Sequence, residues 1–95
     1  MLEKQIEKSV CEYARGKGAL ALKFNSMARA AVPDRLFVYR GNMWFCEFKR
    51  EGQKPTPAQE REHARLREHS IHVYVIDNVE DGCWMVDREM ARVVP

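Results

Sequence analysis

The fold is decided by residues 33–49, which read PDRLFVYRGNMWFCEFK. Two apolar runs, 36–39 and 43–48, flank a short polar break, and its Gly-Asn pair predicts a β-hairpin with Gly41 and Asn42 at the turn. Both runs are apolar at successive positions, which is typical of central strands that are covered on both faces. We therefore expect this hairpin to form the centre of a small sheet.

The rest of the chain supplies helices and further strands around the hairpin. The sequence Thr-Pro-Ala-Gln at 56–59 is a capping box, and it predicts a helix from Thr56 to about His69 that crosses over to a parallel strand. The other expected elements are a helix over 2–17, strands over 19–24 and 71–76, a turn over 78–82, an edge strand over 83–86 and a short final helix capped by Asp87. The predicted fold class is α/β: an αβββαβ core in which helices flank a small mixed sheet, as one domain over residues 1–95.

Composition excludes several classes of protein. Apolar residues make up 45% of the chain and charged residues 32%, which is typical of a soluble globular protein, and no apolar run approaches the length of a membrane helix. The widely spaced cysteines predict no disulfide framework, and His63, His69 and His72 match no closed zinc site. We expect an intracellular protein, in the cytoplasm or nucleoid of its host cell, that is not secreted and has no membrane partner.

The charges are distributed unevenly along the chain. Residues 1–54 contain 11 Lys and Arg against 6 Asp and Glu, whereas residues 55–95 contain 5 against 8. The first part therefore has a net charge of +5 and the second a net charge of −3. A basic surface of this kind is suited to a polyanion such as nucleic acid.

Charged residues interrupt the second strand of the hairpin. Glu47 and Lys49 are two positions apart, so their side chains share one face beside Phe45. Burying a charge costs several kcal/mol unless the charge is paired or binds a metal. With the turn at 41–42, Asp34 is a diagonal neighbour of Glu47 on the same face, with Cβ atoms about 7 Å apart. A one-residue slip of the register would move Asp34 to the opposite face.

Two carboxylates at this separation can bind a shared cation. Oxygen ligands without cysteine or histidine point to Mg²⁺ or Mn²⁺ rather than to zinc. Such an ion can polarise a phosphodiester and lower the pKa of a bound water, and Lys49 can orient that water or stabilise charge on the phosphate. The structural alternative is a buried ion pair of Lys49 with Asp34 or Glu47, which requires only one of the two carboxylates.

The pair Pro33-Asp34, followed across a hairpin by Glu47-Phe48-Lys49, resembles the PD-(D/E)xK nuclease superfamily. More narrowly, the chain resembles the virus-type replication-repair nuclease (VRR-NUC) domain. The resemblance implies a restriction-endonuclease-like fold and a Mg²⁺- or Mn²⁺-dependent endonuclease that hydrolyses phosphodiester bonds in DNA. Asp34 and Glu47 would be metal ligands, the carbonyl of Phe48 a further ligand, and Lys49 the catalytic lysine.

The resemblance extends over about residues 3–76 and assigns roles to two further side chains. One is a first-helix glutamate, Glu7 or Glu3, and Glu7 is preferred because its distance to Gly18 better resembles junction resolvases. The other is Gln59, although the capping box explains this residue without any chemistry.

The resemblance also implies a substrate and an assembly. Small members of the family stand alone in viral genomes and resemble Holliday-junction resolvases, so branched DNA in replication, repair or recombination and a homodimer are expected. The candidate phosphate contacts are Arg29, Arg35, Arg50 and Lys54. The alternatives are a non-catalytic nucleic-acid-binding module that retains the fold, and a small dimeric regulatory protein unrelated to nucleic acid.

Overall fold

The computed structural model describes residues 1–93. Its four strands form one mixed sheet in the order β1-β2-β3-β4, in which the first three are antiparallel and β4 is parallel to β3. Within the described residues, no helix has both the length and the apolar character required to cross a membrane. The elements are α1 (Glu3–Gly16), β1 (Leu20–Lys23), β2 (Arg35–Tyr39), β3 (Asn42–Phe48), α2 (Pro57–Glu68), β4 (His72–Ile76) and α3 (Val79–Met90).

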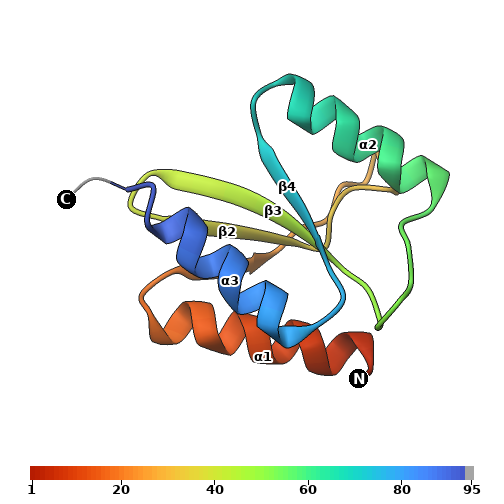
Figure 1. Ribbon diagram of the computed structural model, residues 1–95. Helices are drawn as coiled ribbons and strands as arrows, with labels where there is room; N and C mark the ends of the chain where they lie inside the picture. Colours follow the sequence, from red (N-terminus) through yellow and green to blue (C-terminus); the bar gives the residue numbers. More distant parts are fainter. Residues whose placement is uncertain (94–95) are drawn as a thin grey trace.

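The helices cover the two faces of the sheet unequally. α1 and α3 lie together on one face, whereas α2 lies on the other face and packs against β4 (Figure 1). The crossover through α2 joins the parallel strands β3 and β4, as the sequence predicts. This arrangement confirms the predicted α/β class with a mixed sheet flanked by helices.

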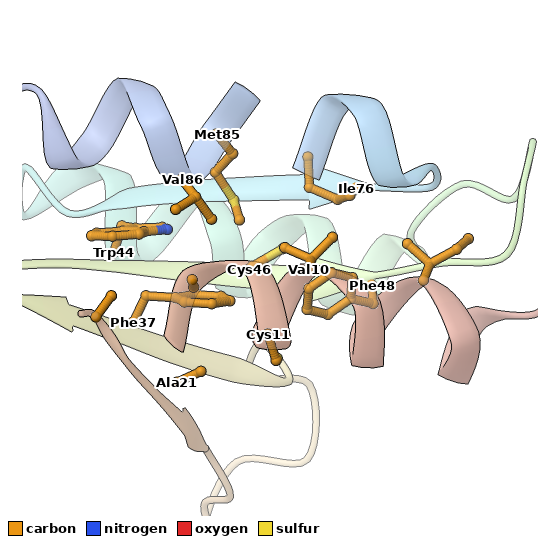
Figure 2. Packing of buried hydrophobic residues seen from close by; sticks show 13 residues of the cluster. Val10, Cys11, Ala21, Phe37, Trp44, Cys46, Phe48, Ile76, Met85 and Val86 are labelled. Atoms are coloured by element: carbon orange, nitrogen blue, oxygen red, sulfur yellow. The ribbon is translucent and has the colours of Figure 1, made fainter. Parts of the chain in front are cut away.

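The hydrophobic core lies between the sheet and the α1–α3 layer. Phe37 and Trp44 are cross-strand partners whose rings stack with centroids 5.4 Å apart. Figure 2 shows Met85 and Val86 of α3 and Val10 of α1 pointing toward the same cluster. These side chains are fully buried, so this layer supplies most of the apolar burial that stabilises the domain.

The hairpin turn differs from the predicted turn. Its central residues are Arg40 and Gly41, which have positive φ angles of 46° and 88°, as in a type I′ turn. Asn42 already belongs to β3, and its side-chain amide donates hydrogen bonds to the Glu89 carbonyl (2.9 Å) and carboxylate (3.0 Å). The prediction of a Gly41-Asn42 turn was therefore wrong, because a contact with α3 places Asn42 in the strand.

The new register preserves the predicted face of Asp34. Arg35 pairs with Cys46, so the next position places Asp34 directly opposite Glu47 rather than diagonal to it. The pairing has shifted by two residues, and side chains on a strand alternate with a period of two. Asp34 and Glu47 therefore remain on one face and lie closer together than predicted.

The C-terminal elements also differ from the prediction. Residues 83–86 are not an edge strand and 78–82 are not a turn, because α3 is one continuous helix from Val79 to Met90. Its N-cap is Asn78, whose side chain accepts a hydrogen bond from the Asp81 amide, and Asp87 lies inside the helix instead of capping it.

A close approach of two helices explains this error. Gly82 is buried where α3 crosses α1, and a Cβ atom there would lie 2.3 Å from the Cγ2 atom of Val10. The glycine therefore allows the helices to pack closely instead of breaking the helix. When Gly82 is counted as a core position, it joins Met85, Val86 and Glu89 at helical spacing.

Candidate active site

Charged side chains converge at the end of the sheet where β3 ends. Asp34 directly precedes β2, and Glu47 lies one residue before the end of β3. The N-terminal ends of α1 and α2 lie at this same end of the sheet, on opposite sides (Figure 1). One strand pair and two helix ends can therefore direct side chains into a single site.

Three carboxylates meet at this site. One oxygen each of Glu3, Asp34 and Glu47 lies within 4.8 Å of the others. The Oδ2 atom of Asp34 also accepts a hydrogen bond of 2.9 Å from the backbone amide of Phe48, which fixes the aspartate against β3. Such a group of oxygen atoms has the ligand chemistry and spacing of a divalent cation site.

The structure brings Glu3 into this group and leaves the preferred residue, Glu7, outside it. Glu7 lies one turn further along α1, where its Oε2 atom accepts a hydrogen bond of 2.6 Å from Nε of Arg35. Arg35 points to the face of the sheet that α1 covers, as Phe37 does, whereas Glu47 points to the other face. Only the first turn of α1 is far enough toward the end of the sheet to reach Glu47.

The crowding of carboxylates changes the protonation of Asp34. Burial raises the pKa of the Asp34 carboxyl to about 6, and the nearby Glu47 carboxylate contributes in the same direction. The hydrogen bond from the Phe48 amide opposes this change but does not outweigh it. Without a cation, the site therefore resists carrying a negative charge on every carboxylate.

Lys49 lies on the same face as Glu47, as the alternation of the strand predicts. Its Nζ atom is 3.8 Å from Oε2 of Glu47, and the two side chains are 8% and 3% exposed. The Lys49 amide donates to the Ile76 carbonyl, which extends the β3–β4 pairing beyond the end of β3. This backbone bond holds the lysine against the sheet beside the carboxylates.

Gln59 has two contacts, one structural and one in the site. Its Oε1 atom accepts a hydrogen bond of 2.9 Å from the backbone amide of Thr56. The backbone amide of Gln59 donates to the Thr56 hydroxyl at 3.2 Å, and the two bonds together confirm the capping box. Its Nε2 atom also donates to Oε2 of Glu47 at 3.4 Å. One side chain therefore caps α2 and contacts a site carboxylate.

His63 is a neighbour of the site that the sequence analysis missed. It is 1% exposed, and its Nε2 atom lies 3.8 Å from Oε1 of Glu47. Its position four residues after Gln59 was an available signal, because residues i and i+4 share one face of a helix. His72 contacts Glu89 of α3 instead, and the described residues place no histidine in a metal-binding group with other ligands.

The four candidate phosphate contacts fall into two classes. Arg29 forms an ion pair with Glu62 at 2.6 Å, and Arg35 is paired with Glu7. Arg50 and Lys54 lie in the loop between β3 and α2, are exposed, and form no ion pair within residues 1–93. Of the four candidates, this second pair has a charge that no ion pair within residues 1–93 occupies.

Comparisons with known proteins place this chain in a family. No family model matches the chain. A protein named "Putative nuclease p44", from Acyrthosiphon pisum secondary endosymbiont phage 1, is 46% identical over 77 residues, which are 80% of this chain and 83% of that protein. A solved structure described as a VRR_NUC domain matches with a TM-score of 0.82 at 32% identity, over 90% of this chain and 94% of that one. The chain belongs to the VRR-NUC family.

Membership confirms the predicted family and its fold. The structural match extends over nine tenths of this chain, so it covers most of the sheet and its flanking helices. The relative from the phage is likewise named as a nuclease. The comparisons therefore identify a nuclease domain with this fold.

Proposed function

We propose that this VRR-NUC domain is a metal-dependent DNA endonuclease of the PD-(D/E)xK type, which hydrolyses phosphodiester bonds. The observation that carries the proposal is the convergence of the Glu3, Asp34 and Glu47 carboxylates within 4.8 Å, beside the buried Lys49. A structural ion pair with one lysine would need a single carboxylate, and the additional ones only add repulsion. The nuclease name of the phage relative supports the same activity.

The residues present fit a hard divalent cation, Mg²⁺ or Mn²⁺. Carboxylate oxygens are the ligands that these ions prefer, and one oxygen each of Glu3, Asp34 and Glu47 lies within 4.8 Å of the others. Glu3, Asp34 and Glu47 would hold the ion, with the carbonyl of Phe48 as the further ligand that the family pattern implies. When bound, the ion would polarise the scissile phosphodiester and lower the pKa of a water.

The remaining roles in the proposed reaction belong to polar and positively charged side chains. The Lys49 ammonium, held beside Glu47, would orient the attacking water and stabilise the negative charge that develops on the phosphate. Arg50 and Lys54 would bind phosphates of the DNA, because they are exposed in the loop that connects β3 to α2. Gln59 would help hold the Glu47 carboxylate through its amide.

A cleavage assay tests this proposal. Linear duplex, flap and four-way-junction DNA are incubated with the protein in Mg²⁺, Mn²⁺ or EDTA. We expect cutting only with metal and none by Asp34→Asn or Lys49→Ala. Glu12→Gln and Lys8→Ala, which change exposed residues of α1, serve as matched controls and should cut normally. Cleavage in EDTA, or by both site variants, would refute the proposal, and binding without cutting would support a non-catalytic binding module.

Metal binding distinguishes the two helix glutamates. We expect Glu3→Gln to weaken Mn²⁺ binding by at least about tenfold, which corresponds to roughly 1.4 kcal/mol. Glu7→Gln should leave the affinity unchanged, because Glu7 is paired with Arg35 on the opposite face of the sheet. Isothermal titration calorimetry without DNA measures both constants. Equal losses in the two variants would contradict the assignment of Glu3.

We also propose that the domain acts on branched DNA as a homodimer. The face of the sheet opposite α1 and α3 carries an uncovered apolar surface, where Leu20, Leu22 and Met43 are 56%, 45% and 50% exposed. Their cross-strand neighbours Leu36 and Val38 continue this surface across β2. A second copy of the chain is the occupant that fits, because a symmetric dimer would supply two sites for cutting two strands of a junction.

Leu22→Glu tests the dimer, since a charge on this surface opposes its burial. Light scattering after size-exclusion chromatography should give a dimer for the unaltered protein and a monomer for the variant. Glu12→Gln should remain dimeric. We expect the monomer to cut a linear duplex but to lose paired cleavage of a four-way junction. A monomeric unaltered protein would refute the dimer without affecting the proposed metal site.

A further inference from the structure

Two buried polar atoms face each other behind the carboxylate group. Nε2 of His63 and Oε1 of Glu47 are 3.8 Å apart, in side chains that are 1% and 3% exposed. Neither atom has a hydrogen-bond partner within residues 1–93. Leaving a buried polar group without a partner costs about 1–3 kcal/mol, so this juxtaposition needs an explanation.

We propose that His63 is a positioning residue whose Nε2–H group donates a hydrogen bond to Oε1 of Glu47 and fixes the orientation of that carboxylate toward the metal. This inference rests on the proposed metal-dependent function. Hydrogen bonds of this kind have a length of about 2.9 Å, so a displacement of roughly 1 Å completes the bond. His63 acts through Glu47, because its own nitrogen is not among the ligand atoms that converge.

The carboxylate needs such a partner because its last torsion is weakly restrained. The terminal torsion of a glutamate is broad and has no sharp staggered wells, so the backbone of β3 cannot by itself set the plane of the carboxylate. Ligating carboxylates are commonly held by a second layer of hydrogen bonds for this reason. His63 is rigid and fully enclosed, so it would impose one orientation.

The helix α2 supplies donors to both oxygens of Glu47. Gln59 donates to Oε2 at 3.4 Å, and His63, one turn later on the same face, lies beside Oε1. Lys49 also approaches Oε2, so His63 is the group within the described residues that faces the remaining oxygen. Both donors lie within the first two turns of α2, which begins with the capping box at Thr56.

Two variants separate positioning from packing. His63→Leu fills a similar volume without a donor, and His63→Gln retains an N–H donor at a similar reach. By isothermal titration calorimetry, we expect His63→Leu to weaken Mn²⁺ binding by roughly 10- to 100-fold and His63→Gln to restore most of the affinity. His69→Leu changes an exposed histidine of the same chain and should bind Mn²⁺ normally.

Kinetics provide a second readout. At limiting Mn²⁺, His63→Leu should lower kcat while the KM for DNA stays unchanged, because His63 is 1% exposed and would act through Glu47 and not on the DNA. A role in packing alone would instead leave Mn²⁺ affinity unchanged in the folded Leu variant, or would make Gln and Leu equivalent, and either result would overturn the inference. Failure of the unaltered protein to bind Mn²⁺ would overturn the proposed function itself, so the two failures are distinguishable.

A spectroscopic measurement on the unaltered protein covers the case in which His63→Leu does not fold. Long-range ¹H–¹⁵N correlation spectra report which ring nitrogen of a histidine carries the proton. We expect His63 to be protonated at Nε2, with the proton directed at Glu47. A neutral ring protonated at Nδ1 alone would overturn the inference, because Nε2 would then be unable to donate.

Discussion

Two glutamates of this domain are buried to a similar extent but are bonded very differently. Glu89 of α3 is 0% exposed, and its carboxylate contacts Asn42 at 3.0 Å, His72 at 2.7 Å and the Tyr74 hydroxyl. Burial alone would raise the pKa of Glu89, but the hydrogen bonds from Tyr74, Asn42 and His72 outweigh it and hold the pKa below its ordinary value. This carboxylate is charged and fully bonded, and it joins α3 to β3 and β4.

Glu47 is 2% exposed, but one of its oxygens has no hydrogen-bond partner in the described residues. Its nearest acidic neighbours, Asp34 and Glu3, repel it when they are ionised. The comparison shows how a buried carboxylate that stabilises the fold differs from one that we propose as a cation ligand. Incomplete bonding beside like charges lowers stability, and a bound cation would offset that cost.

The largest expected effect is the loss of stability when the fully bonded carboxylate of Glu89 is removed. Glu89→Ala leaves the side chains of Asn42, His72 and Tyr74 without their shared partner, so we expect the free energy of unfolding to fall by about 3–5 kcal/mol. Urea unfolding measures this loss. Mn²⁺ affinity should be unchanged under conditions in which the variant is folded, since Glu89 lies on the α3 side of the sheet. A stability change within 1 kcal/mol would refute the structural role, about 1 kcal/mol being the net contribution of a single hydrogen bond.

Replacing Glu47 should have the reverse pattern to Glu89→Ala: activity should fall and stability should not. Glu47→Gln removes a ligand and a repulsive charge, so we expect kcat to fall by about 10²–10³-fold while stability stays equal or increases. Single-turnover cleavage and urea unfolding, run on the same preparation, give the two values. A loss of stability comparable to that of Glu89→Ala would show that Glu47 belongs to the same structural class.

The pH dependence of stability should identify Asp34 as the carboxylate with the raised pKa. The pKa of Asp34 is raised from 3.8 to about 6, so its contribution to the stability of the metal-free protein is complete below pH 3.8 and is lost as the pH rises through about 6. In EDTA, Asp34→Asn should therefore gain stability relative to the unaltered protein between pH 4 and about 7, as measured by urea unfolding.

A second aspartate provides the control for this measurement. The pKa of Asp87 is lowered by its hydrogen bonds from Lys17 and Tyr13, so its titration in the folded protein lies below 3.8. Asp87→Asn should therefore show no such slope over the same pH range. A flat difference for Asp34→Asn would contradict the raised pKa of Asp34.

The smallest expected effect concerns Gln59, which both caps α2 and contacts the Glu47 carboxylate. Gln59→Ala removes part of the helix cap, so we expect a loss of about 0.5–2 kcal/mol in the free energy of unfolding, together with slower cleavage. Thr56→Ala removes the same cap without touching Glu47, and it should lower stability equally while kcat is unchanged. Equal rates for the two variants would assign Gln59 to the cap alone.

Much of this fold follows from local pattern. The alternation of β3 places Glu47 and Lys49 together, and Thr56-Pro57-Ala58-Gln59 begins α2 as a capping box, because both features depend on residues a few positions apart. The error in residues 83–86 arose where the local signal was ambiguous. An apolar run after a glycine fits a strand, but Gly82 is the contact of α3 with Val10.

The sequence by itself determined the order of the elements from α1 to β4, the shared face of Asp34, Glu47 and Lys49, and the family that these residues indicate, since strand alternation and helix capping act over short distances. Only the tertiary structure decided that Glu3 rather than Glu7 joins the carboxylates and that His63 lies behind Glu47. Both outcomes depend on where a helix meets the end of a sheet. That position is set by packing between residues far apart in the chain, and no local spacing specifies it.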